Sequence, residues 1–91
     1  MAIKRDKIKG QEVEVNNGYK ELIEDGEKDT IYFLRNLAIH NMGADIVHVI
    51  INGGDEISIQ PNEVLTCGDI KVYSLIVVEV GSHIRYMGIE G

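Results

Sequence analysis

Apolar and polar residues alternate in short runs along this chain, and turn residues interrupt the runs before a helical period becomes established. The pattern is clearest between residues 46 and 60, where two alternating runs flank the sequence Asn52-Gly53-Gly54-Asp55. Two alternating runs joined by a short turn of this composition predict a β-hairpin. The chain is therefore predicted to adopt an all-β fold.

Similar runs recur along the rest of the chain. They predict strands at residues 12–15, 30–41, 45–52, 57–60, 64–66, 70–80 and 83–89. The run at 70–80 is the strongest. It has apolar residues at both alternating sets of positions, that is, on both faces of the strand, so it is expected to lie in the middle of a sheet. Residues 19–30 keep a helical spacing only as far as Asp25-Gly26, and we expect a loop with one helical turn there.

Two of these strands carry further information about their faces. The strand at 30–41 is apolar on both sides, which is typical of a strand that is central in a sandwich or covered on its outer side by another subunit. Its two faces are Ile31, Phe33, Leu37 and Ile39 on one side, and Tyr32, Leu34, Ala38 and His40 on the other. In the last strand, Ile84 and Tyr86 are expected to face opposite to Arg85 and Met87.

About seven or eight short antiparallel strands predict a β-sandwich or a jelly-roll-like fold, and a small barrel remains an alternative. With 91 residues the chain forms one domain, which we expect to span residues 11–91 after an extended arm at residues 1–10. The sequence has no Trp and one Phe, so the core must consist mostly of Ile, Val and Leu.

The charge is unevenly distributed. The formal net charge is −6; residues 1–9 contribute +3 through Lys4, Arg5, Lys7 and Lys9 against Asp6, which leaves −9 on the remainder. An acidic body repels phosphate backbones, so nucleic acid is not expected as a partner. We predict that the four basic residues bind an acidic or strand-edge surface of a partner protein, the alternative being a solvated tail.

No residue group predicts catalysis or a cofactor. His40, His48 and His83 fall on three different predicted strands, so ordinary hydrogen-bonded side chains are expected and a three-histidine metal site is the lesser alternative. Cys67 is the only cysteine and is expected to be a small buried apolar residue. No serine lies in a Gly-x-Ser-x-Gly elbow, so we do not expect an enzyme.

The remaining features predict surface properties. The acidic stretch at residues 25–29 is expected to be a solvated loop, with a calcium site as the alternative. Most of the four tyrosines are expected to pack in the core with their hydroxyl at the surface, with sugar stacking as the alternative. Residues 1–10 lack the apolar centre of a signal peptide and no run is long enough to cross a membrane, so we expect a soluble protein made in the cytoplasm.

Four segments between residues 46 and 88 follow one another in a distinctive order. They are Val-Ile-Ile-Asn-Gly-Gly at 49–54, Ile-Ser-Ile-Gln-Pro-Asn-Glu at 57–63, Ser-Leu-Ile-Val at 74–77 and Gly-Ser-His-Ile-Arg-Tyr at 81–86. In this order they resemble a group of small β-rich structural proteins of tailed bacteriophages. The resemblance covers about half of the chain; it implies a structural role in a virion and transfers no functional residue.

The resemblance implies a capsid decoration or cement protein that binds neighbouring shell subunits. Its expected partner is then the major capsid protein or another virion protein, and its location the virion, after synthesis in the host cytoplasm. A homo-oligomer, for which we choose a trimer, is expected. The alternatives are a phage tail, baseplate or fibre module, and a β-sandwich that binds a carbohydrate or another small ligand.

Overall fold

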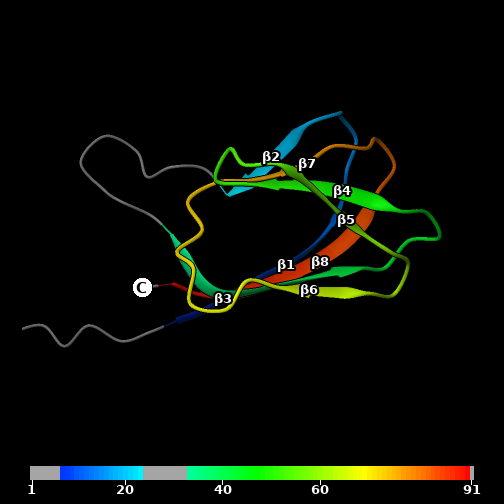
Figure 1. Cartoon of the computed structure of the whole chain (residues 1–91). Coiled ribbons are helices and arrows are strands. Elements are labelled where there is room, and N and C mark those ends of the chain that lie inside the picture. Colours follow the sequence, from blue (N-terminus) through cyan, green and yellow to red (C-terminus); the bar gives the residue numbers. More distant parts are fainter. Residues whose placement is uncertain (1–6, 24–32, 91) are drawn as a thin grey trace, which may run out of the picture.

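The computed structural model describes residues 7–23 and 33–90, and within these ranges the protein contains strands and no helix (Figure 1). The strands are β1 (Lys7–Glu14), β2 (Lys20–Ile23), β3 (Leu34–Asn41), β4 (Val47–Ile51), β5 (Glu56–Ile59), β6 (Val64–Thr66), β7 (Leu75–Val77) and β8 (His83–Glu90). All pairings between them are antiparallel. The prediction of an antiparallel all-β fold is confirmed.

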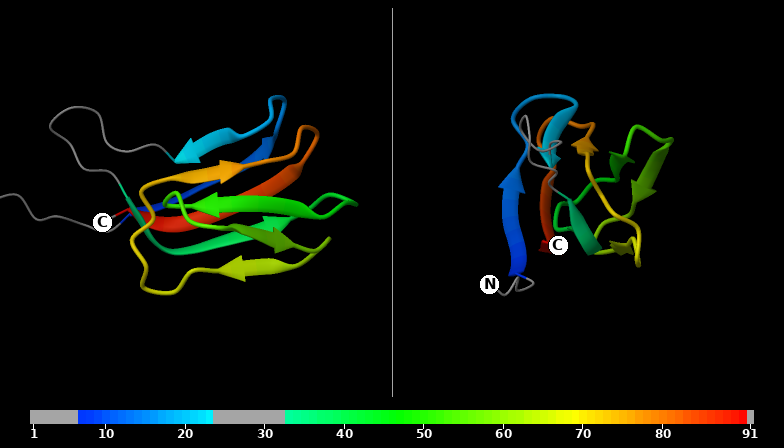
Figure 2. Two further views of the ribbon diagram at one scale, coloured as in Figure 1. Left: turned by 45° about the horizontal axis from the view of Figure 1, so that its top comes forward. Right: turned by 90° about the vertical axis from the view of Figure 1, so that its left-hand side faces the viewer.

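The strands form two four-stranded sheets that face each other as the layers of a sandwich (Figure 2). The first sheet has the order β1-β8-β3-β6, and the second has the order β2-β7-β4-β5. The side chains between the layers are almost entirely aliphatic, as the composition predicted. The buried core consists of Val15, Ile23, Leu34, Leu37, Ile39, Val47, Val49, Ile59, Val72, Leu75, Val77, Ile84 and Tyr86.

The predicted hairpin is present as β4 and β5. Its turn is closed by a hydrogen bond from the Gly54 N–H to the Ile51 carbonyl (3.0 Å), and Asn52 and Gly53 both have positive φ, as a type I′ turn requires. The register pairs Val47 with Ile59, which are both buried. Local sequence therefore accounts for this part of the second sheet.

Strand β8 confirms the faces predicted for it, since Ile84 and Tyr86 are buried and Arg85 and Met87 are exposed. Gly88, two residues after Tyr86 and on the same face of β8, is also buried. A Cβ at this position would lie 3.0 Å from the Cβ of Leu34. A glycine is therefore needed for β3 to pack closely against β8.

In β3 the regular alternation predicted for residues 30–41 is wrong, because Asn36 forms a β-bulge. Asn36 has φ of +51°, and the register with β8 shifts between Arg35 and Ala38. Leu34 and Leu37, which were assigned to opposite faces, are consequently both fully buried. The N–H of Asn36 donates to the carbonyl of Gly68 (3.0 Å), which anchors the bulge to the loop after β6.

Two further predictions are corrected by long-range hydrogen bonds. Residues 20–23 form β2 and pair with β7, where a loop with a helical turn was expected. The predicted long strand at 70–80 is reduced to β7, because Asn52 binds the backbone of residues 71–74 and holds it out of the ladder. Strand β7 does lie between β2 and β4, as expected for a central strand.

Strand β1 begins at Lys7 and pairs with β8 over its whole length. Residues 7–10, which the sequence predicted as part of an arm, therefore belong to the sheet. The strand predicted at residues 12–15 falls within and just after β1, which is the outermost strand of the first sheet. Residues 1–6 lie outside the described part of the chain.

Candidate binding surfaces

The outward-facing side chains of the first sheet form a surface that includes exposed apolar residues. We call this region the outer face. It is formed by Ile8, Gly10, Glu12, Arg35, Ala38, His40, Val64, Thr66, Arg85, Met87 and Ile89. These residues meet because the antiparallel register places directly opposed side chains on the same side of the sheet.

Three large apolar side chains on the outer face are exposed. Ile8 is 73% exposed, Val64 is 50% exposed and Met87 is 44% exposed. Met87 projects between two shallow hollows of about 440 and 220 Å³, the first bounded by Gly10 and the second by Ala38. A surface with hollows on both sides of the flexible Met87 side chain can pack against the side chains of a partner protein.

Charged groups border these apolar side chains. Glu12 and Arg85 are directly opposite each other across β1 and β8, and the Nε2 atom of His83 lies 2.8 Å from Glu12 Oε1. His40 is opposite Arg85 on the other side. An apolar centre with arginine and a polar border is the composition found in protein–protein interfaces.

A second candidate surface is a cleft of about 560 Å³ at the open side of the sandwich, between the β4–β5 hairpin and β6. Its apolar walls are formed by Ile51, Ile57, Leu65, Cys67 and Ile70. Hydrogen bonds hold the segments on both sides of the cleft, since the side chain of Asn52 binds the backbone of the 71–74 segment and the 67–70 turn is bound to β3. The cleft is therefore tied to both sheets.

Cys67 is half-buried in this cleft and packs against the core, in a less enclosed position than the sequence predicted. Burial raises the pKa of its thiol above the ordinary value. Because the thiolate is the reactive form, the thiol is a poor nucleophile at neutral pH. The position of Cys67 favours a packing role.

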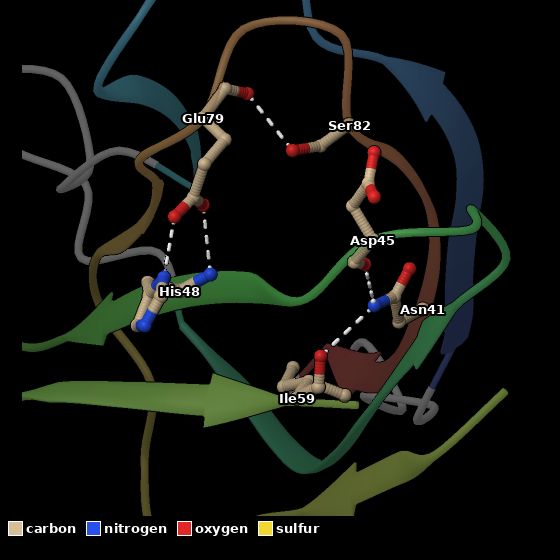
Figure 3. A network of polar contacts seen from close by, with 6 residues as sticks. All are labelled: Asn41, Asp45, His48, Ile59, Glu79 and Ser82. Atoms are coloured by element: carbon tan, nitrogen blue, oxygen red, sulfur yellow. Dashed lines mark hydrogen bonds and ion pairs between the residues drawn. The ribbon is translucent and has the colours of Figure 1, made fainter. Parts of the chain in front are cut away.

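The end of the sandwich opposite this cleft is closed by polar contacts (Figure 3). The amide of Asn41 donates to the carbonyls of Asp45 (2.7 Å) and Ile59 (2.9 Å), and its Oδ1 accepts the N–H of Gly43 (3.0 Å). Ser82 Oγ donates to the carbonyl of Glu79 (2.9 Å). The bond from Asn41 to Ile59 joins the two sheets, and the others satisfy polar groups near the core, which is a structural role.

Glu79 also binds His48, whose backbone N–H (2.8 Å) and ring Nδ1 both contact the carboxylate. Partial burial raises the pKa of the Glu79 carboxyl, but the hydrogen bonds from the backbone and ring of His48, and the charge of that ring, outweigh it. The net effect is a pKa below the ordinary value. The pair links β4 to the segment after β7.

The three histidines are not brought together. His40 and His83 lie in the first sheet, whereas His48 lies in the second. Within residues 7–23 and 33–90, no group of three or more His, Cys, Asp or Glu side chains could hold a metal ion. The acidic stretch at 25–29, considered as a calcium site, lies outside the described residues.

The basic residues predicted to bind a partner are only partly covered by the structure. Lys9 is exposed, and its Nζ lies 3.7 Å from Glu90 Oε2. Lys7 is the first residue of β1. Lys4 and Arg5 lie outside the described residues, so their contact with a partner stays a prediction.

The tyrosines differ in environment. Tyr86 is buried and its hydroxyl donates to Gln11 Oε1 (3.2 Å), and Tyr73 stacks at a tilt against Phe33, with 5.5 Å between ring centroids. Tyr19 is 63% exposed, so it does not share the core position expected for most of the tyrosines. Tyr32 lies outside the described residues.

Comparison with protein-family models, curated proteins and solved structures finds no match for this chain. In the described residues there is also no helix that is long and apolar enough to cross a membrane. The functional interpretation is therefore based on the geometry of the outer face and of the cleft.

Proposed function

We propose that this chain is a non-enzymatic structural protein of a tailed-bacteriophage virion, and that it decorates the capsid by binding neighbouring shell subunits through the outer face. The observation that supports this most directly is the exposure of Ile8, Val64 and Met87 on one sheet. Burying such side chains contributes about 25 cal/mol per Å² of apolar surface. A partner that covers this face therefore gains binding energy.

The charge distribution is consistent with this role. The acidic body keeps many copies soluble, while Arg85 and the basic start of the chain offer contacts to acidic groups of a shell subunit. Lys4, Arg5, Lys7 and Lys9 would extend the interface beyond the sheet. The proposed partner is the major capsid protein or another virion protein.

Counting copies in purified particles tests this proposal. Quantitative peptide mass spectrometry should find this chain at a ratio near one to the major shell protein. A ratio of a few per cent would instead assign the chain to the tail, baseplate or fibre, and absence from the particles would overturn a virion role.

A surface variant tests the outer face itself. Met87→Glu places a charge at its centre and should reduce capsid occupancy about tenfold, since loss of one interface anchor costs about 1.4 kcal/mol or more. Val80→Glu is the matched control, because Val80 is 66% exposed in the turn before β8 and lies off this face. Equal occupancy of the two variants would overturn the assignment of the face.

Removal of residues 1–6 tests the basic arm. This truncation leaves β1 complete, whereas a deletion that continues to Lys9 would remove part of the sheet. Attachment should weaken while the fold stays intact. Unchanged occupancy would show that Lys4 and Arg5 take no part.

The cleft between the β4–β5 hairpin and β6 favours a second candidate function, the binding of a small ligand. Its lining contains no aromatic ring, so an apolar molecule fits it better than a sugar. An apolar fluorescent probe should bind the wild-type protein and lose its signal in Ile70→Asp. Probe fluorescence that is equal in the two proteins would exclude this cleft.

A further inference from the structure

Within residues 7–23 and 33–90, no strand pairs with the outer edge of β1, and this edge presents a regular row of backbone groups. The N–H of Val15 donates to Ser82 (2.8 Å) and its carbonyl accepts from Gly81 (2.7 Å), so the backbone of Val15 points toward the chain that leads into β8. Because backbone direction alternates along a strand, Val13, Gln11 and Lys9 also point toward β8. The N–H and C=O groups of Ile8, Gly10, Glu12 and Glu14 therefore point away from the sheet.

A contact on the other side of β8 supports the same assignment. The carbonyl of His83 accepts the N–H of Met42 (2.9 Å), so the backbone of His83 points toward the β3 side. His83 is the register partner of Glu14. Glu14 must then belong to a pair that is not hydrogen-bonded between β1 and β8, and its backbone groups point outward.

This edge lacks several devices that commonly prevent strand addition. Strand β1 contains no proline, and its eight register pairs with β8 run without a shift. Lys9 is on the face of β1 that corresponds to the inner face of the sheet, where a charged side chain can prevent another strand from pairing. Its ammonium group, however, lies beside the carboxylate of Glu90. A second extended strand can therefore approach the edge.

The charge order along β1 selects the direction of that strand. Lys7 and Lys9 are in the first half, and Glu12 and Glu14 are in the second. An antiparallel neighbour of the same sequence brings the basic half of one strand close to the acidic half of the other, with Lys9 and the two glutamates on opposite faces of the joined sheet, whereas a parallel neighbour aligns like charges on the same face. A second copy of this chain is thus a complementary partner.

Backbone direction also restricts the register. Outward-pointing residues must oppose outward-pointing residues, so around a two-fold axis Gly10 faces Ile8, Gly10, Glu12 or Glu14 of the second copy. When Gly10 faces Ile8, Gly10 or Glu14, at least one outward residue finds no opposing outward residue within β1. When Gly10 faces Glu12, all four outward residues are used: Ile8 faces Glu14, Gly10 faces Glu12, and Gln11 lies at the axis.

We infer that two copies pair their β1 strands antiparallel around an axis at Gln11, which joins the two β1-β8-β3-β6 sheets into one continuous sheet. The outer faces of both copies then form one surface, and the exposed Ile8 gains a neighbour. This pairing predicts a dimer in place of the trimer expected from the sequence.

Sedimentation equilibrium tests the pairing. The wild-type protein should have the mass of a dimer, and Glu12→Pro should shift it to a monomer, because proline removes an outward N–H that β8 does not use. Glu12→Ala keeps the N–H and should remain dimeric. Circular dichroism should show that both variants are folded. A monomeric or trimeric wild-type protein would overturn the inference.

A cross-link tests the register. In a Cys67→Ser background, Gln11→Cys should form a disulfide-linked dimer on mild oxidation, because opposed residues of a non-hydrogen-bonded pair have Cα atoms about 4.5 Å apart. Lys9→Cys in the same background is the control and should stay uncross-linked, since Lys9 faces Val13 of the second copy. A stronger cross-link from position 9 would contradict the register. These outcomes are independent of the particle counts that test virion location.

Discussion

Asn41 and Asn52 hold opposite ends of the sandwich with the same kind of hydrogen bond, but in different solvent environments. Asn41 is fully buried at the end of β3, and its amide donates to two backbone carbonyls. Asn52 is exposed after β4; it donates to the carbonyl of Lys71 (2.9 Å) and accepts the N–H of Tyr73 (2.8 Å). One asparagine closes its end, and the other supports an open cleft.

The comparison shows how solvent access changes the value of one interaction. At the buried end, water cannot replace the amide of Asn41, so the loss of its bonds leaves carbonyls unsatisfied. At the exposed end, water can hydrate the groups that Asn52 releases. The closed end should therefore contribute more to stability, while the open end remains accessible for binding.

The largest effect is expected from Asn41→Ala. This change removes both donated bonds and leaves a small cavity, so the free energy of unfolding should fall by about 2–4 kcal/mol. Urea denaturation of the purified protein measures it. A loss below about 1 kcal/mol would show that the buried end does not depend on this amide.

Asn52→Ala should be less damaging, with a loss of about 1–2 kcal/mol, because its bonds are exposed and part of the loss comes from its φ of +52°. Asn52→Gly is the control, since glycine accepts this backbone conformation while still removing the side-chain bonds. The glycine variant should be the more stable of the two. The same denaturation series gives the ranking, and an Asn52→Ala loss that equals that of Asn41→Ala would break the comparison.

A smaller, pH-dependent effect is expected from Glu79 at the closed end. Because its pKa is lowered in the folded protein, ionised Glu79 stabilises the fold above the unfolded pKa, and this contribution is lost as the pH falls through the folded pKa. Glu79 and His48 are both partly exposed, so the contribution should not exceed about 0.5 kcal/mol.

Glu79→Gln tests this contribution. The variant should be slightly less stable at pH 7 and should show a weaker loss of stability between pH 5 and pH 3, as measured by thermal unfolding across this range. An identical pH profile for the two proteins would show that the carboxylate makes no net contribution.

The smallest change in stability is expected at the cleft itself. Ile70 is 57% exposed, so Ile70→Asp should alter the free energy of unfolding by no more than about 0.5 kcal/mol. The loss of apolar-probe binding proposed above should therefore occur without unfolding. A large loss of stability in this variant would show that Ile70 supports the fold, and the loss of probe binding could then not be assigned to a direct contact with Ile70.

Much of the fold could be predicted from local patterns. The β4–β5 hairpin follows from alternation and from a turn whose Asn-Gly pair accepts positive φ, and the faces of β8 follow from alternation alone. The same reasoning failed at β3, since the bulge at Asn36 shifts the alternation by one residue. It also failed at residues 70–74, because Asn52 binds that backbone from another part of the chain.

The candidate surfaces were less predictable. Alternation separates Met87 from its buried neighbours, but it does not say which strands lie beside β8. Ile8 was assigned to an arm, and its place beside Ile89 depends on a pairing between the two ends of the chain. The cleft likewise requires β5 and β6, which are edge strands of different sheets.

The sequence by itself determined that this protein is all-β and where several of its turns lie, because side-chain alternation and turn residues act over a few neighbouring positions. Only the tertiary structure decided the strand order, the role of residues 7–10 and 20–23 as strands, and the side of each sheet that meets solvent. These features depend on hydrogen bonds and packing between residues far apart in the chain, for which no local pattern is sufficient.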